Sequence, residues 1–173
     1  MVSRFSRVFS QPHLLLRSPG EPSVVGTLAQ ATPVTLRGMR VRALRGRCAC
    51  SVVAFEVSDE FVEAYNCHCS NCRALTGSAF LPWGEIEPET MRVTKGADSL
   101  VVIGDADGHH AVRCKECFSL LYYTGYEGKI RLPYGSLIDE PALKPTAHMF
   151  VGSKASWHEI LDGLPQYDES PWS

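Results

Sequence analysis

The chain is organised around the segment Cys67-His68-Cys69-Ser70-Asn71-Cys72-Arg73, in which three of seven residues are cysteines. Thiolates two and three positions apart can all reach one soft cation, so this pattern predicts most of a metal site. A closed tetrahedral zinc site needs four ligands, and the segment supplies only three thiolates. The absent fourth ligand is the first indication of what the site does.

The other four cysteines form two pairs, Cys48 with Cys50 and Cys114 with Cys117. Together they offer the four thiolates of a closed structural zinc site, which would join positions more than sixty residues apart and so stabilise the fold. The three thiolates of the central segment would then bind a second zinc ion with an open position. Other pairings of the seven cysteines stay open.

A closed second site is also an open alternative, with a histidine or a distant carboxylate as the fourth ligand. The histidine candidates are His68, His109 and His110. His68 suits this role least, because its alternating position points away from the neighbouring cysteines. His109 and His110 fall in a turn rich in Gly and Asp and are expected to be solvated.

The composition is that of an ordinary soluble globular protein, with 45% hydrophobic and 21% charged residues. A chain of 173 residues suffices for one domain with a sizeable core, so metal would supplement burial. Seven cysteines at CxC and CxxC spacing suit a disulfide framework poorly, because a bridge between residues two apart is strained. Reduced thiolates on metal predict a reducing compartment, the cytoplasm.

Charge is unevenly distributed along the chain, whose formal net charge is −2. Residues 1–38 hold four arginines and one acidic residue, so they carry +3 and the remainder carries −5. An acidic body argues against a nucleic-acid partner, which requires clustered Lys and Arg. No apolar run approaches the roughly 20 residues of a membrane span, so no membrane partner is expected.

Residues 1–38 are expected to lie outside the fold, because they contain four prolines and show no sustained periodicity. They are interpreted as a disordered tail, an upstream extension of the reading frame or an organellar transit peptide. A transit peptide would place the protein in mitochondria instead of the cytoplasm. Residues 39–167 are expected to form a single zinc-stabilised domain, and residues 168–173 a tail.

From Met39 onward, short alternating or β-branched stretches separated by Gly-rich turns predict a mainly β domain of short antiparallel strands. A helical turn is expected to open near Cys69 to Cys72 and to close at Gly77. A second helical turn is expected over Ser156–Leu161, with Trp157 packed against the fold. The expected strands cover residues 40–46, 51–57, 61–66, 79–83, 91–95, 100–103, 111–113, 120–124 and 129–132.

Several motifs occur in a fixed order between about Met39 and Tyr167. They are Gly46-Arg47-Cys48-Ala49-Cys50, the segment 67–73 with Thr76-Gly77-Ser78, Cys114-Lys115-Glu116-Cys117, Lys154, Trp157 and Leu164-Pro165-Gln166-Tyr167. In this combination the chain resembles the glutathione-dependent formaldehyde-activating enzyme family, which includes centromere protein V.

This resemblance implies a β-tent fold stapled by two zinc ions. It implies a structural zinc and a catalytic zinc, bound respectively by Cys48, Cys50, Cys114 and Cys117 and by Cys67, Cys69 and Cys72. It also implies carbon–sulfur lyase activity like that of an S-hydroxymethylglutathione synthase, with glutathione as the substrate.

One residue departs from the pattern of that family, which usually has Gly after the last cysteine of the CxxC motif. This chain has Phe118 there. A positive φ at a residue other than Gly would cost about 1 kcal/mol or more. The CxxC turn is therefore expected to be either strained or shaped differently.

The leading functional hypothesis is a zinc-dependent carbon–sulfur lyase-type enzyme, in which glutathione or another small thiol adds to formaldehyde or a related aldehyde. Arg73, Thr76 and Ser78 would orient a carboxylate of the substrate, and Trp83 would form a wall of the pocket. The alternative is a non-catalytic, zinc-stabilised binding module whose second zinc site is closed.

Overall fold

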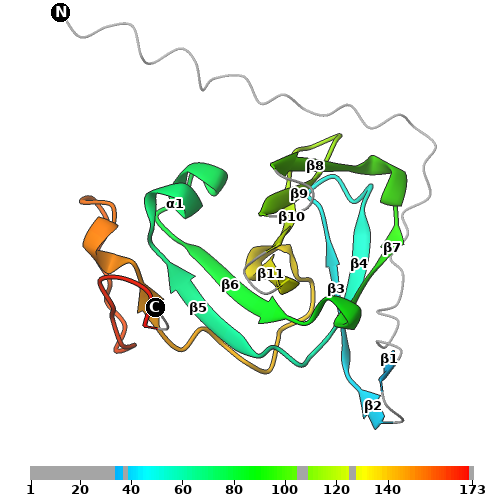
Figure 1. Ribbon diagram of the computed structural model, residues 1–173, viewed down its shortest axis with the longest axis horizontal. Coiled ribbons are helices and arrows are strands. Elements are labelled where there is room, and N and C mark those ends of the chain that lie inside the picture. The colour runs from blue at the N-terminus through cyan, green and yellow to red at the C-terminus, as the bar shows by residue number, and fades with distance from the viewer. Residues whose placement is uncertain (1–33, 37–38, 105–108, 125–127, 172–173) are drawn as a thin grey trace, which may run out of the picture. The chain divides into compact units, whose positions relative to one another are not determined.

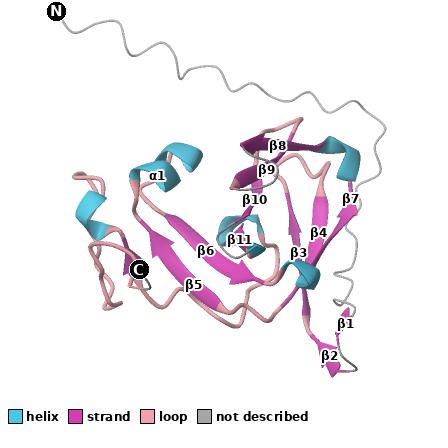
Figure 2. Cartoon of the chain, in the orientation of Figure 1, coloured by secondary structure: helices cyan, strands magenta, loops and turns pink. Residues whose placement is uncertain are grey.

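The computed structural model describes residues 34–36, 39–104, 109–124 and 128–171. Strands make up most of the regular structure in these residues, so the expected mainly β class is confirmed (Figure 2). Most of the expected leader lies outside the described residues. Its described part, β1 (Val34–Leu36), pairs with β2 (Met39–Val41), so the expected boundary after residue 38 falls inside a hairpin.

Two larger sheets contain the other strands (Figure 1). The smaller is antiparallel with the order β3-β4-β7, and its strands are Ala43–Arg47, Ala54–Ser58 and Met91–Lys95. The larger has the order β12-β5-β6-β11-β10-β9-β8, and its strands are His148–Met149, Glu63–Cys67, Leu81–Ile86, Ile130–Pro133, Leu120–Thr124, His110–Cys114 and Leu100–Gly104. The expected strands match these within a few residues at each end, except that the first is divided between β2 and β3.

One strand pair departs from the expected antiparallel arrangement. β12 lies parallel to β5, with His148 aligned to Asn66 and Met149 aligned to Cys67. A parallel pair needs a long connection, and residues 134–147 provide it by returning the chain from β11 to the outer edge of β5. The carboxyl-terminal segment is thereby placed beside the central cysteine segment.

The α-helix α1 (Ser70–Thr76) is inserted between β5 and β6, as Figure 1 shows. It ends as expected at Gly77, whose φ is +69° and whose N–H donates a hydrogen bond to the carbonyl of Arg73. No helix in the described part of the chain is long and apolar enough to cross a membrane. Short 3₁₀ helices cover Pro88–Thr90 (η1), Ala97–Ser99 (η2) and Tyr134–Ser136 (η4).

The expected helical turn over Ser156–Leu161 is wrong. The helical turn comes earlier, as the 3₁₀ helix η5 (Val151–Ser153). Within residues 156–161 there is only a tight turn, in which the N–H of His158 donates to the carbonyl of Ala155 at 3.0 Å. The chain then continues without a helix to Asp162, whose carboxylate accepts the N–H of Leu164 at 3.0 Å and lies 3.0 Å from Nε2 of His148. Trp157 is 72% exposed, so the expectation that it packs against the fold is also wrong.

Each cysteine group lies within a cluster of buried side chains. The first cluster joins Cys48 and Cys114 to apolar residues of both larger sheets, namely Leu44, Val53, Phe55, Val57, Ile86, Leu121 and Leu132. The second joins Cys67 and Cys72 to a different set that includes Tyr65, Leu81, Trp83 and Met149. Close-packed surroundings of this kind hold the thiols in place by contact as well as by backbone geometry.

An ion pair between Arg45 of β3 and Asp139 links distant parts of the chain, with contacts of 2.9 and 2.7 Å. Arg45 lowers the pKa of Asp139 to about 2. A carboxyl group with a depressed folded-state pKa stabilises the fold above its unfolded-state pKa, and this stabilisation is lost as pH falls through the folded-state pKa. Asp139→Asn is therefore expected to lower the free energy of unfolding by about 1 kcal/mol at pH 7, because the pair is partly exposed.

The difference between wild type and Asp139→Asn should shrink between about pH 4 and pH 2, where the wild-type carboxylate is protonated. Urea unfolding of both proteins at neutral and acidic pH measures this difference. An equal difference at both pH values would show that the ion pair is not its cause.

Candidate metal centres

Cys48, Cys50, Cys114 and Cys117 form a four-thiolate group whose sulfur atoms all lie within 4.8 Å of one another. The Sγ atoms of Cys48 and Cys50 are 3.5 Å apart, and those of Cys50 and Cys114 are 3.9 Å apart. A tetrahedral zinc ion with Zn–S bonds of about 2.3 Å separates its sulfur ligands by about 3.8 Å. No disulfide joins these cysteines, so the donor set fits a closed zinc site.

Two backbone turns form the four-thiolate group. Between β3 and β4 the chain closes a turn in which Ser51, at φ 62°, donates its N–H to the carbonyl of Cys48. The N–H of Val53 donates to Cys48 Sγ at 3.2 Å. Between β9 and β10 the second turn closes where the N–H of Phe118 donates to the carbonyl of Cys114 at 2.8 Å. Donors aimed at sulfur favour the thiolate form that binds zinc.

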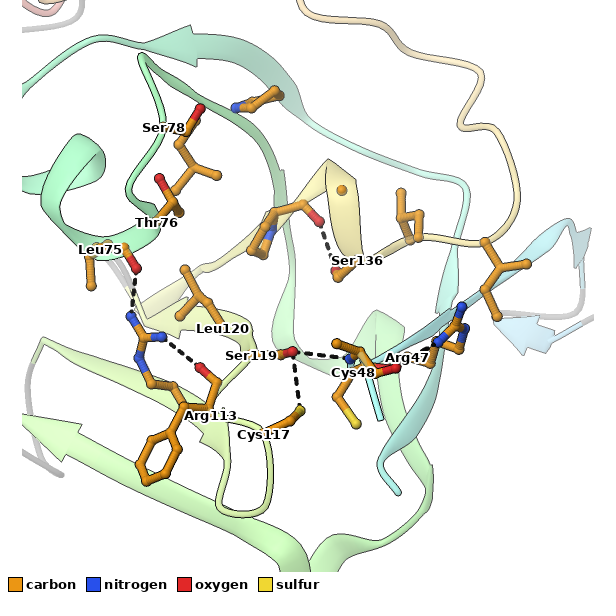
Figure 3. Close-up of a pocket in the computed structure, with 18 of the residues that line it drawn as sticks. Arg47, Cys48, Leu75, Thr76, Ser78, Arg113, Cys117, Ser119, Leu120 and Ser136 are labelled. Carbon is orange, nitrogen blue, oxygen red and sulfur yellow. Dashed lines mark hydrogen bonds between the residues drawn. The ribbon is translucent and has the colours of Figure 1, made fainter. Parts of the chain in front are cut away.

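Ser119 connects the two halves of this group (Figure 3). Its hydroxyl lies 3.2 Å from Cys117 Sγ and accepts the N–H of Ala49 at 3.0 Å. The pKa of Cys117 is lowered to about 5, first by the hydrogen bond from this hydroxyl. Sequence reasoning missed Ser119, whose only signal is its place two residues after the last cysteine of the CxxC motif.

Phe118 has the positive φ that the family pattern assigns to Gly, at +58°. Its side chain is 62% exposed, so packing does not explain the conformation. Arg113 supports the turn, because its guanidinium donates to the Phe118 carbonyl at 2.7 Å and to the Leu75 carbonyl at 3.0 Å (Figure 3). The turn is therefore strained but not reshaped, and Arg113 connects it to α1.

Phe118→Gly is expected to raise the free energy of unfolding by about 0.5 to 1 kcal/mol. A residue with a Cβ atom pays about 1 to 2 kcal/mol to adopt the left-handed conformation, and Gly does not. This gain outweighs the larger backbone entropy that Gly loses on folding. Thermal or urea unfolding measures the change. The control is Glu116→Gly in the same turn, where φ is not positive and the substitution should destabilise. A loss of stability in Phe118→Gly would contradict this account of the turn.

Cys67, Cys69 and Cys72 form a three-thiolate group whose sulfur atoms also lie within 4.8 Å of one another. Cys67 is the last residue of β5, Cys69 is the N-cap of α1, and Cys72 lies in its first turn. The Cys69 sulfur accepts the N–H of Cys72 at 3.3 Å, so the cap that starts the helix also orients a thiol. The strand end and the helix start together bring the three sulfurs to one point.

The surroundings of this group favour thiolate. The Trp83 indole N–H donates to Cys72 Sγ at 3.3 Å. The pKa of Cys72 is lowered to about 6, first by the hydrogen bond from Cys67 and further by Trp83. The same hydrogen bond is the first cause of a raised pKa at Cys67. One thiol of the pair is thus ionised at neutral pH, and thiolate is the form in which cysteine binds zinc.

The three-thiolate group has no fourth protein ligand within the described part of the chain. No histidine nitrogen or carboxylate oxygen in that part joins the sulfurs within 4.8 Å. His68 is fully buried on the other side of the segment, where its Nε2 lies 2.7 Å from Nδ1 of His148. His110 lies in β9 and contacts the Thr124 hydroxyl at 2.9 Å, so it is not merely solvated. His109 stacks on Tyr123.

A cavity of about 720 Å³ contains the three-thiolate group. Its lining combines apolar and aromatic residues with five charged ones, and includes Tyr65, Leu75, Trp83, Tyr123, Met149, Phe150, Glu63, Glu85, Lys129, Arg131 and Glu169. Trp83 lines this cavity as expected and is also part of the buried core. Of the charged residues, Glu63, Glu85 and Arg131 lie on β5, β6 and β11, whereas Lys129 and Glu169 lie outside the strands.

The residues expected to orient the substrate do not line this cavity. Arg73 donates to the Ser153 carbonyl at 3.1 Å, and its Nε is buried without a partner among the described residues. The Thr76 hydroxyl donates to the Cys72 carbonyl at 3.0 Å. Thr76 and Ser78 instead line a separate cavity of about 660 Å³ that adjoins the four-thiolate group (Figure 3).

Comparisons with known proteins bear on the family. A solved structure of a Rhodobacter sphaeroides protein is similar to this chain, with 20% identity, a TM-score of 0.47, and coverage of 59% of this chain and 98% of that one. No curated protein matches the chain. The family model described as glutathione-dependent formaldehyde-activating enzyme matches residues 43–153. Since that match spans more than half of the sequence and includes all seven cysteines, the chain belongs to the glutathione-dependent formaldehyde-activating enzyme family.

Proposed function

We propose that this protein is a zinc-dependent carbon–sulfur lyase-type enzyme that adds a small thiol, glutathione in the first instance, to formaldehyde or a related small aldehyde. The observation that carries this proposal is the three-thiolate group, which lies in a 720 Å³ cavity and has no fourth ligand among the described residues. Structural zinc sites are closed by four protein ligands, whereas catalytic sites keep an exchangeable position. Membership of the family supports the same pair of substrates.

A zinc ion held by Cys67, Cys69 and Cys72 would supply an open position at which a thiol loses its proton at neutral pH. In the overall reaction one bond forms between sulfur and the aldehyde carbon, and the carbonyl oxygen takes up the proton that the thiol gave up. Trp83 and Tyr65, at 3% and 4% exposure, exclude water from this end of the cavity. The reverse reaction breaks the same carbon–sulfur bond and releases the aldehyde.

The four-thiolate group would hold a second, structural zinc ion, which gives two ions per chain. The seven cysteines are all unpaired, and free thiols suit a reducing compartment. We therefore propose a cytoplasmic location.

The test is proton NMR of a mixture of glutathione and formaldehyde with and without the zinc-loaded protein. The protein is expected to accelerate the exchange between free thiol and hydroxymethyl adduct well beyond the rate with an equal amount of zinc salt. Exchange at the uncatalysed rate would contradict the synthase proposal and favour a zinc-stabilised binding module.

A further inference from the structure

The cavity that contains the three-thiolate group has a second, charged end. Glu63, Tyr65 and Cys67 alternate along β5 and face the same cavity. Glu63 is aligned with Glu85 on β6, and Glu85 is aligned with Arg131 on β11. At a rise of about 3.3 Å per residue, Glu63 lies about 13 Å along the strand from Cys67. A ligand that occupies both ends must therefore be longer than an amino acid.

One carboxylate at this end, that of Glu63, forms no direct ion pair among the described residues, and Lys129 and Arg131 act on it only from a longer distance. Glu85 is 8% exposed, and its two oxygens pair with Lys129 at 3.4 Å and Arg131 at 3.3 Å. In the described residues no hydrogen bond or ion pair joins the Glu63 carboxylate to a neighbour. Burial, followed by the charge of Glu85, raises the pKa of Glu63. Glu169 lies toward the three-thiolate end, where its backbone carbonyl accepts the N–H of Phe150. The lining as a whole has three carboxylates and two cations, so the cavity favours a cationic group.

We infer that Glu63 binds the ammonium group of the thiol substrate, and that it selects thiols whose free α-amino group belongs to a residue joined to the cysteine nitrogen, as the γ-glutamyl amine of glutathione does. The inference rests on the proposed function, because it takes the sulfur to lie at the three-thiolate group. In glutathione eight bonds separate the cysteine sulfur from the α-amino nitrogen, an extended length of about 9 Å, which with the length of the Glu63 side chain covers the distance between the two ends. Free cysteine is too short, because its amine lies close to its sulfur.

The test compares two thiols that differ only in the ammonium group, glutathione and glutaryl-cysteinyl-glycine. Their Kd values for the zinc-loaded full chain are measured by isothermal titration calorimetry, which does not depend on turnover. Wild type is expected to bind glutathione about tenfold tighter, since a charged hydrogen bond contributes this much. In Glu63→Gln the two Kd values should agree within about twofold. The control is Glu60→Gln, an exposed residue outside the cavity, which should keep the wild-type preference.

Two results would overturn the inference: equal affinities in wild type, or an undiminished preference in Glu63→Gln. The wild-type comparison needs no variant, so it decides the question even where Glu63→Gln fails to fold, which circular dichroism detects. If both thiols bind equally and the NMR assay shows turnover, only the role of Glu63 is lost. If neither thiol binds, the proposed function and this inference fail together.

Discussion

Cys69→Ser is expected to lower the rate of thiol–aldehyde adduct formation by more than about a hundredfold while leaving the fold intact. Mutation of a residue that only hydrogen-bonds to a metal ligand lowers metal affinity or activity by about 10- to 100-fold. Loss of one of the three thiolate ligands themselves should have at least as large an effect. The fold should survive because Cys69 is the N-cap of α1, and serine is among the best N-cap residues. The NMR exchange assay and far-UV circular dichroism measure the two effects.

The control for this prediction is Ser70→Ala, the adjacent exposed position at the start of α1. It should keep both the wild-type exchange rate and two zinc ions per chain. Unfolding of Cys69→Ser would assign the three-thiolate group a structural role. Exchange at the wild-type rate would exclude Cys69 from the chemistry.

Cys114→Ser is expected to unfold the domain, or to lower its free energy of unfolding by about 3 kcal/mol or more. Cys114 is fully buried in the first core cluster, and the four-thiolate group joins the β3–β4 turn to the β9–β10 turn. Without the fourth thiolate the cross-link between these distant segments is lost. Urea unfolding followed by circular dichroism measures the change.

Glu116→Ala is the matched control, because Glu116 is exposed in the same CxxC turn. It should change stability by no more than about 0.5 kcal/mol. A Cys114→Ser protein that keeps wild-type stability would refute the structural role of the four-thiolate group. The same substitution, Cys to Ser, is thus expected to reduce stability in the four-thiolate group and activity in the three-thiolate group.

Local chemistry made the cysteine grouping and its helix predictable from sequence. The spacing of the seven cysteines indicated the four-thiolate and three-thiolate groups that the fold brings together. Gly77 marked the end of α1, because a left-handed residue closes a helix there. Phe118 adopts the positive φ that the family pattern assigns to Gly.

Features that depend on pairing between distant strands were not predictable from sequence. The charged end of the cavity exists because Glu63, Glu85 and Arg131 are aligned across three strands. The sequence of one strand does not determine which residues of the neighbouring strand lie opposite it. The parallel pairing of β12 likewise depends on a long connection. Arg73, Thr76 and Ser78 are near the three thiols in sequence, but Thr76 and Ser78 line the other cavity and Arg73 donates to the Ser153 carbonyl.

Cadmium NMR of the protein with both sites loaded with cadmium tests the central claim most directly, because the chemical shift reports the number of sulfur ligands at each ion. Without added thiol, two resonances of equal area are expected, one typical of four sulfur ligands and one of three. Added glutathione should move only the second resonance, to the position typical of four. Two resonances that both report four sulfur ligands, or a three-sulfur resonance unmoved by glutathione, would contradict the account of an open site that accepts the substrate thiol.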